Sequence, residues 1–369
     1  MDFSLSSEQE AVADLADRIF TDRLTAERFK AVDAAMPRFD RDLWSELARA
    51  GLLTVSLPEA DGGGGEGYLA TALLLEQAGR HAAPVPLLAT VVLGALPIAR
   101  FGSAAQRGAL LPSLAAGELV VTAALTEAGA DPSAPTTSAV ADGDGWRLSG
   151  AKLCVPAGAI AHRVLVTATT PDGEAGVFVV DTADPGVGVT PLITTTRDPE
   201  ANLALDGAAG ERLGRGGEVL PWLTIHATAA MCSVMAGVCK RVVVLTAEYT
   251  KTREQFDRPI ASFQAVGQRA ADAYIDAEAV QLTSRQAAWR LSEGLPAAEE
   301  VAIAKFWAAD GGQRVVHAAQ HLHGGMGVDR DYPLHRYFLL AKQLELSLGG
   351  ATAQLLKLGA ILASEPASL

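Results

Sequence analysis

The sequence predicts an α+β protein in which two helical regions flank one β region. Residues 1–118 and 216–369 carry apolar side chains at helical spacing, whereas residues 119–215 carry short β-branched and apolar runs separated by Gly, Asp and Pro. Helices and strands do not alternate, which argues against a doubly wound sheet. We therefore expect an N-terminal all-α domain, a middle antiparallel β-barrel or sandwich domain, and a C-terminal four-helix bundle.

The composition restricts the classes of partner. The 369 residues carry a formal net charge of −13, which argues against nucleic acid and anionic membranes. Three cysteines without metal-ligand spacing indicate no metal site and fit a reducing cytoplasm better than a disulfide framework. The acidic N-terminus lacks the pattern of a secretory signal. The apolar segment 224–244 contains His226, so we expect a helix buried in an oligomer rather than a membrane span.

Capping residues mark the expected helix starts in the N-terminal region. The segment Ser6-Ser7-Glu8-Gln9 offers N-cap chemistry before an apolar-periodic run. Asp40 is a suitable N-cap for a second amphipathic helix that runs to about Leu53. A glycine-rich loop follows at 58–65 and contains no phosphate-loop lysine. Residues 68–101 are again expected to be helical.

The middle and C-terminal regions differ in the period of their apolar residues. Short runs that predict strands stand at 119–125, 146–148, 164–167, 177–180 and 203–205. Longer helical patterns stand at about 217–251, 262–293, 297–320 and 333–362, with a stop signal at Gly349-Gly350.

Two short motifs in the C-terminal region indicate a ligand. One is His321-Leu322-His323-Gly324-Gly325-Met326-Gly327, which stands before Tyr332-Pro333. Its glycines allow a backbone to come close to a ligand. The other is Thr252-Arg253-Glu254-Gln255-Phe256-Asp257-Arg258-Pro259, between the first two predicted helices. An arginine there can make charge-assisted contacts to a pyrophosphate. A plain turn and a solvated Arg–Glu pair are the alternative interpretations of these motifs.

Together with the order of helices and strands, the motifs resemble the acyl-CoA dehydrogenase family over nearly the full chain. The first resembles Q-x-x-G-G-x-G followed by Y-P, with His321 at the glutamine, and the second resembles T-R-x-x-F-G-x-P, with Asp257 at the glycine. The resemblance implies FAD bound at a subunit interface, where such segments contact the adenosine-pyrophosphate half of a neighbour's cofactor. It assigns FAD contacts to Arg253, Gln255, Phe256, His321, Leu322, Gly324 and Gly325, with secondary contacts from Thr126 and Pro156.

The residues that would face the isoalloxazine ring depart from the family pattern. The family's T-E-P-x-x-G-S-D and G-x-K-x-W-I-T-N correspond to the segments 126–133 and 150–157. Cys154 stands at the tryptophan that stacks on the ring. Pro156, which has neither a hydroxyl nor an N–H, stands at the threonine that hydrogen-bonds near flavin N5. A structural strand with a kink explains this segment equally well.

Neither family position of the catalytic base carries a carboxylate. Leu348 stands at the glutamate of Y-E-G-T, and the alternative glutamate-arginine pair corresponds to about Ala227-Thr228. Glu345 lies about 4.5 Å along the helix from Leu348 and is the fallback base. Asp131 and His226 are further candidates.

The sequence therefore favours one subunit of a heteromeric enzyme. The tail 334–350 is similar to the base-less partner in the α2β2 acyl-CoA dehydrogenases of actinobacterial sterol side-chain degradation. This resemblance implies a second acyl-CoA dehydrogenase-like subunit, an acyl-CoA substrate and an electron-transfer flavoprotein as partners. Two alternatives stay open: a homomeric flavoenzyme with a non-standard base, and a cofactor-free binding or scaffold protein on the same fold.

Overall fold

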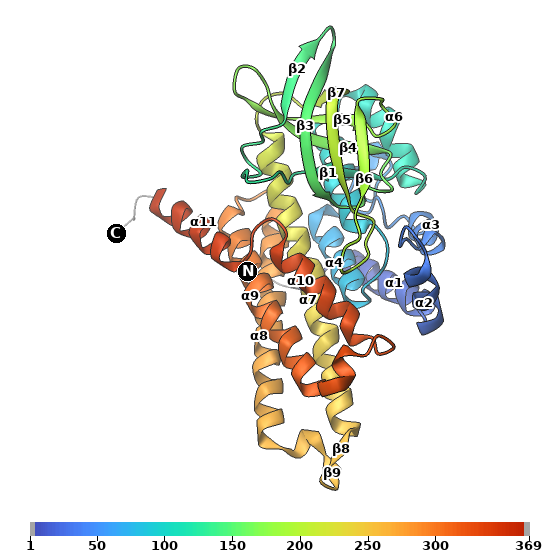
Figure 1. Cartoon of the computed structure of the whole chain (residues 1–369), viewed down its shortest axis with the longest axis vertical. Coiled ribbons are helices and arrows are strands. Elements are labelled where there is room, and N and C mark those ends of the chain that lie inside the picture. Colours follow the sequence, from blue (N-terminus) through green and yellow to red (C-terminus); the bar gives the residue numbers. More distant parts are fainter. Residues whose placement is uncertain (1–3, 365–369) are drawn as a thin grey trace. The chain divides into compact units, whose positions relative to one another are not determined.

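The computed structural model describes residues 4–364, in which one β region stands between two helical regions of the chain (Figure 1). Of these residues, one compact unit contains those up to Thr71 together with Pro84–Ala227, and a second contains Ala72–Ala83 and those from Thr228 onward. The predicted succession of helices, strands and helices is confirmed. The predicted domain boundaries near 118 and 215 stay a prediction.

The N-terminal helices begin where the sequence provides capping side chains. Ser6 and Gln9 form a reciprocal capping box at the first helix, and Asp40 Oδ1 accepts a 3.0 Å hydrogen bond from Leu43 N at the third. The third helix ends at Arg49 rather than near Leu53, because the chain turns at Gly51. The helices of this region are α1 (Ser7–Arg23), α2 (Ala26–Ala34), α3 (Arg41–Arg49), η1 (Glu59–Asp61), α4 (Gly67–Arg80), the π-helical η2 (Leu88–Ala95), α5 (Leu96–Phe101) and α6 (Ala104–Ala115).

The middle region is a closed and mainly antiparallel barrel. The ring of pairings runs β4–β5–β7–β3–β2 and returns to β4, while β1 and β6 pair with β4 and β7. The β1–β4 and β2–β4 pairs are parallel, which the expectation of an antiparallel sheet did not include. The strands are β1 (Val121–Ala124), β2 (Ser138–Asp142), β3 (Gly145–Val155), β4 (Arg163–Thr169), β5 (Ala175–Asp181), β6 (Val187–Pro191) and β7 (Ala201–Leu213).

Alternating side chains of these strands fill the barrel core. Along β7, Leu203 and Leu205 are buried while the residues between and after them are more exposed, which is the period of two expected for a half-buried strand. They pack with Leu148, Val166 and Phe178 from other strands. The strands β2 and β6 were not predicted, because most of their residues are at least partly exposed and form no apolar run.

The C-terminal helices match the predicted positions with one correction. The expected single helix at 333–362 is wrong, because the chain turns at 347–350, where Leu348 and Gly349 have φ of +54° and +92°. The elements here are α7 (Val219–Thr252), β8 (Glu254–Gln255), β9 (Arg258–Pro259), η3 (Ile260–Ser262), α8 (Gln264–Ser292), α9 (Ala298–His323), η4 (Gly324–Val328), α10 (Leu334–Leu346) and α11 (Ala351–Ser364).

Two stretches of the described chain are long and apolar enough to cross a membrane by length and composition, Val219–Thr252 and Leu334–Ser364. The apolar part of the first is 78% buried inside the structure, as a core helix would be. The second is not one continuous helix, since the turn at 347–350 divides it into α10 and α11.

Candidate functional site

The Arg253 segment forms a small exposed hairpin directly after α7. Glu254 and Gln255 of β8 pair with Pro259 and Arg258 of β9, and the two residues between the strands have φ of +55° and +60°. Two consecutive positive φ angles are the requirement of a type I′ turn. The second of these residues is Asp257, and aspartate is among the few side chains that tolerate this conformation. Asp257 can therefore replace the family's glycine without a change of turn.

The side chains of this hairpin face solvent. Phe256 is 85% exposed, and Arg253 and Gln255 are exposed as well. The backbone beneath them is fixed, because Arg253 N donates to Tyr249 O over 2.8 Å and Arg253 O accepts from Ile260 N over 2.8 Å. An aromatic ring and a permanent cation on an ordered support suit contact with another molecule.

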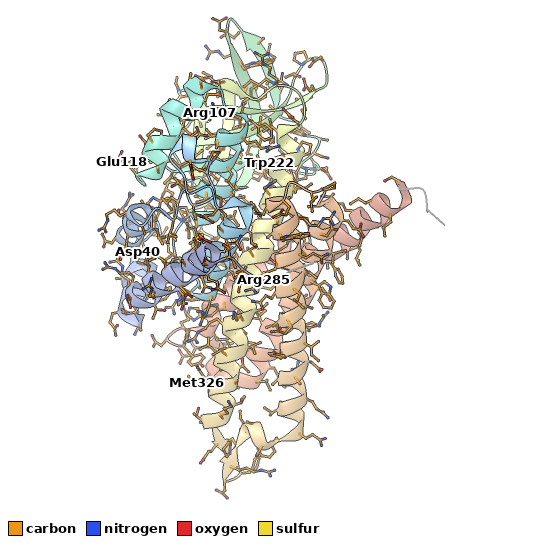
Figure 2. All side chains as sticks on the ribbon, turned by 180° about the vertical axis from the view of Figure 1, so that it is seen from behind. Asp40, Arg107, Glu118, Trp222, Arg285 and Met326 are labelled. Carbon is orange, nitrogen blue, oxygen red and sulfur yellow. The ribbon has the colours of Figure 1, made fainter. Side chains whose placement is uncertain are left out.

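The glycine turn after α9 leaves its backbone open. Gly324 ends the helix with φ +57° and ψ −133°, a conformation that only glycine adopts readily. A Cβ placed on Gly324 or Gly325 would meet no atom within 4 Å, whereas one on Gly327 would lie 2.9 Å from Gln320 Nε2. Figure 2 labels Met326, which marks the position of this turn. Gly327 therefore serves the fold, while Gly325 leaves room for a close approach from outside.

His321 and Leu322, near the end of α9, differ in their surroundings. His321 is exposed near the end of α9, and Leu322 is buried. Of the two, His321 can reach a ligand with its side chain, whereas Leu322 contributes chiefly its backbone and its packing.

Tyr249 connects the hairpin to the glycine turn. It lies one helical turn before Arg253 on α7, and its hydroxyl donates to the carbonyl of His323 over 3.3 Å. Its ring stacks on that of His323 at 4.4 Å between centroids. The structure thus brings the two predicted FAD-contacting segments into one neighbourhood. Tyr249 was not among the predicted site residues, although its position four residues before Arg253 was a usable signal.

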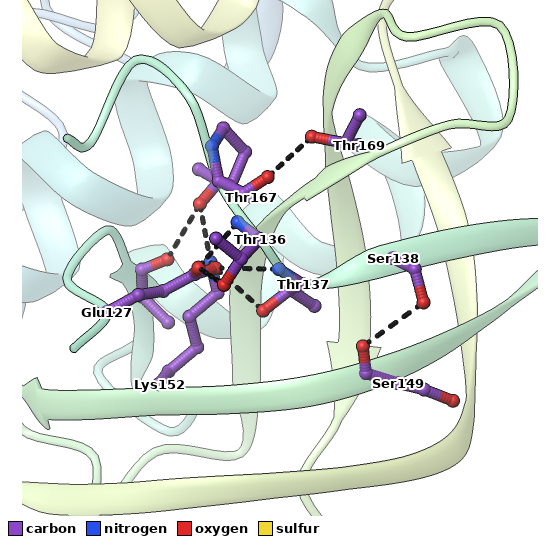
Figure 3. Close-up of polar contacts among 10 residues, drawn as sticks. Glu127, Thr136, Thr137, Ser138, Ser149, Lys152, Thr167 and Thr169 are labelled. Carbon is purple, nitrogen blue, oxygen red and sulfur yellow. Dashed lines mark hydrogen bonds and ion pairs between the residues drawn. The ribbon is translucent and has the colours of Figure 1, made fainter. Parts of the chain in front are cut away.

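The barrel contains a buried ion pair near the other predicted contacts. Figure 3 shows Lys152 and the threonines around the carboxylate of Glu127. Lys152 Nζ lies 2.5 Å from Glu127 Oε1 and 2.8 Å from Thr167 Oγ1. Thr137 Oγ1 donates to Oε1 over 2.7 Å, and both the N–H and the hydroxyl of Thr136 donate to Oε2. Burial opposes the charge of Glu127, but these donors outweigh it and lower its pKa to about 2.

The segment next to this ion pair has an unusual backbone. Cys154 and Ala157 have φ of +48° and +55°. Thr126, which is exposed, accepts from Leu153 N over 2.9 Å, and Pro156 O accepts from Thr122 Oγ1 over 2.7 Å. The end of β3 is therefore an ordered kink, and it carries Cys154 and Pro156 at the positions where the resemblance implies a ring-stacking tryptophan and a hydroxyl.

The segment around Leu348, one of the two positions where the resemblance implies a base, is also an ordered turn. Leu348 O accepts from Gln354 Nε2 over 3.0 Å, and its φ of +54° is unusual for leucine. The fallback base Glu345 has its Oε2 2.6 Å from Lys342 Nζ, within the same helix. The Glu345 carboxylate is therefore held by a local ion pair within α10.

The other candidate bases are occupied by local contacts. Ala227 is fully buried, and the neighbouring His226 stacks on Trp222 with its Nδ1 2.8 Å from Trp222 O. Burial lowers the pKa of His226 to about 4. Asp131 Oδ1 accepts from the N–H and the hydroxyl of Ser133 in a local turn.

Comparison with known proteins assigns the whole chain to a family. The models of the N-terminal, middle and C-terminal domains of acyl-CoA dehydrogenase match residues 6–118, 122–206 and 214–361. The chain belongs to the acyl-CoA dehydrogenase family. The predicted family, fold class and enzyme class are thereby confirmed, and the chain is of the oxidoreductase type.

Several acyl-CoA dehydrogenases are similar to the chain over its full length. Acyl-CoA dehydrogenase FadE27 of Mycobacterium tuberculosis (strain ATCC 25618 / H37Rv) is 44% identical over 379 residues, with 100% of both chains covered. A chain in the ChsE4-ChsE5 complex from Mycobacterium tuberculosis has a TM-score of 0.95 and 45% identity, with 100% of both covered. A chain of a variant of the Tcur3481-Tcur3483 steroid ACAD has a TM-score of 0.93 and 48% identity, covering 98% of this chain and 99% of the other.

FAD is the cofactor of this acyl-CoA dehydrogenase, and solved structures that are similar to it include FAD complexes. The described residues fit one half of that molecule. The open backbone at Gly324-Gly325 and the exposed Arg253 and Phe256 suit a pyrophosphate and its nucleoside. The kinked end of β3 does not offer the ring-stacking side chain that the family uses for the isoalloxazine.

Proposed function

We propose that the chain is the subunit of a heteromeric acyl-CoA dehydrogenase that lacks the catalytic glutamate and completes the FAD site of a glutamate-bearing partner. The observation that carries this proposal is the contrast between two sites in one chain. Leu348 stands in an ordered turn at the base position, while Arg253, Phe256 and the glycine turn stay exposed. A surface that suits FAD but has no catalytic base beside it is what we expect of a subunit that completes the FAD site of its partner.

The relatives support a second subunit of the same kind. Two of the similar solved structures are each named for two components, ChsE4 with ChsE5 and Tcur3481 with Tcur3483, and the second pair is described as a steroid ACAD. We therefore propose a partner of acyl-CoA dehydrogenase type and an acyl-CoA thioester of steroid type as substrate. An electron-transfer flavoprotein as electron acceptor and a cytoplasmic location complete this hypothesis.

The roles of this chain's residues follow from their chemistry. FAD, when bound, would supply the hydride-accepting chemistry at the β-carbon of the thioester, and a base would remove the α-proton. In this proposal Arg253 neutralises part of the pyrophosphate charge and Phe256 packs on the nucleoside. Gly324 and Gly325 allow the backbone to approach the phosphates, with His321, Leu322 and Gln255 beside them. Thr126 and Pro156 stay secondary contacts. The base comes from the partner.

The test compares the purified chain with its complex. We expect the chain alone to hold almost no flavin and to be inactive on acyl-CoA thioesters, whereas the complex with a glutamate-bearing partner should hold half as many FAD as polypeptide chains. The measurements are flavin absorbance per chain, native mass and dye reduction with a panel of acyl-CoAs.

Two other outcomes would replace the proposal. A yellow homo-oligomer with one FAD per chain and substantial turnover would make this an autonomous enzyme. Glu345→Gln would then test the fallback base directly, and its matched control would be Glu299→Gln, at the start of α9. A chain that binds neither FAD nor a second subunit would instead be a scaffold on this fold.

A further inference from the structure

The contacts of His323 define how its ring is protonated. The side chain is 2% exposed at the end of α9, with Nδ1 2.8 Å from Ala319 O and Nε2 3.1 Å from Tyr332 Oη. A carbonyl oxygen cannot donate, so Nδ1 carries the proton and Nε2 accepts from the tyrosine hydroxyl. Burial lowers the pKa of His323, which favours this neutral form. The ring therefore joins the last turn of α9 to Tyr332, which stands beyond the glycine turn.

The ring of His323 also lies between two tyrosines. Tyr249 stacks on it at 4.4 Å, and the ring of Tyr332 lies 5.2 Å away, tilted by 49°. The Tyr249 and Tyr332 rings themselves are 6.3 Å apart. Three elements thus converge here: the end of α7, the end of α9 and the segment before α10.

Hydrogen bonds connect this cluster to the two segments that we propose contact FAD. Tyr249 Oη donates to the carbonyl of His323, whose peptide leads directly into Gly324. On its other side, the carbonyl of Tyr249 accepts from the N–H of Arg253. Tyr332 holds the chain on the far side of the turn through His323. Apolar rings alone would fill the space, but they could not donate a hydrogen bond to the carbonyl of His323, whereas the bond between Tyr249 O and Arg253 N is a backbone bond at the end of α7.

We infer that Tyr249, His323 and Tyr332 form an aromatic clamp that positions the Arg253 hairpin and the Gly324-Gly325 turn relative to each other for FAD. These three are positioning residues, since they act through the backbone of the residues that contact the cofactor. The inference rests on the proposed function of these two segments as an FAD half-site. It adds that the affinity for FAD depends on two partly buried hydroxyl groups, those of Tyr249 and Tyr332, that need not touch the cofactor.

The test uses the assembled enzyme with the variants Tyr249→Phe and Tyr332→Phe, which remove one hydroxyl each and keep the rings. Loss of one such hydrogen bond should weaken FAD binding about 3- to 10-fold. Because only positioning is affected, kcat at saturating FAD should return to the wild-type value. A purely structural fault would lower kcat or the thermal midpoint, and added FAD would not restore it. Tyr274→Phe, at an exposed tyrosine of α8, is the matched control.

The variant Arg253→Ala tests the proposed FAD half-site independently of the aromatic clamp. If Arg253→Ala releases FAD while both clamp variants bind FAD as tightly as wild type, the clamp is wrong and the half-site stands. If Arg253→Ala also leaves FAD binding unchanged, the half-site is wrong and the clamp falls with it. Weakened FAD binding in both clamp variants, with kcat restored by FAD and no effect of Tyr274→Phe, supports the clamp.

Discussion

Replacing Lys152 with methionine removes one partner of the buried ion pair in the barrel and keeps the length of the side chain. The side chains of Lys152 and Glu127 are 0% and 3% exposed. Without Nζ, the Glu127 carboxylate keeps its donors from Thr136 and Thr137 but loses its only counter-charge within that cluster. Removal of one partner of a buried pair destabilises a protein by about 3–5 kcal/mol. We expect a loss of this size for Lys152→Met.

The assay is urea unfolding of the chain, with two further variants. Lys342→Met is the matched control, because Lys342 also pairs with a glutamate at 2.6 Å but is 33% exposed. Exposed pairs contribute only about 0–1 kcal/mol. The double variant Glu127→Gln/Lys152→Met leaves no buried charge and should be more stable than Lys152→Met alone. Equal losses for Lys152→Met and Lys342→Met would refute the reasoning.

The same ion pair predicts how stability depends on acid. The pKa of Glu127 is about 2, below its ordinary value of 4.5. Since the pKa is lowered in the folded state, the stabilisation is fully present above pH 4.5 and is lost as the pH falls toward 2. In Lys152→Met the pKa of Glu127 should rise, so acid unfolding should begin at a higher pH. Unfolding curves that respond identically to pH in both proteins would contradict this.

Three further predictions concern other parts of the chain. Arg253→Ala and Gly325→Val should each release FAD from the assembled enzyme with little change in the urea midpoint, whereas Gly108→Val, where a Cβ also meets open space, should retain it. Burial lowers the pKa of His226 to about 4. Lowering the pH from 6.5 to about 4 should therefore cost about 3 kcal/mol of the free energy of unfolding through this residue. The variant His226→Asn should lack this part of the pH dependence in denaturant titrations. Leu348→Gly should be more stable than Leu348→Val by about 1–2 kcal/mol, because a φ of +54° is least compatible with a β-branched side chain; equal urea midpoints would count against it.

The parts of the fold that could be predicted are those fixed by local sequence. Ser6, Gln9 and Asp40 cap helices because their side chains reach only three residues along the chain. The stop signal at Gly349-Gly350 marked the break at 347–350, but apolar residues continue on both sides of it, so the segment 333–362 was still expected to be one helix. The parallel β1–β4 pair could not be predicted, because the local sequence of a strand does not determine which strand pairs with it or in which orientation.

For the candidate site, the two segments expected to contact FAD could be found in the sequence, but the residues that support them could not. Arg253 and Gly324 stand in motifs that the sequence displays directly. Tyr249 joins them through the carbonyl of His323, which is 74 residues away. In the same way, Glu127 and Lys152 appear in sequence as parts of two separate motifs, and only the fold shows that they form one ion pair. Contacts between distant residues are set by packing, which a single sequence does not report.

The turn around Leu348, the position that the resemblance assigns to the catalytic base, is held by a buried lysine. Lys305 is 1% exposed, and its Nζ donates to Leu344 O over 2.5 Å and to Glu345 O over 3.1 Å. These carbonyls end α10 and have no helical partner, so the buried lysine caps the helix and stabilises the turn that follows. The side chain at 348 can therefore change without loss of the turn. The exposed residues that suit FAD lie in other segments, so the side chain at 348 places no constraint on them, and the proposed role beside a glutamate-bearing partner requires only those residues.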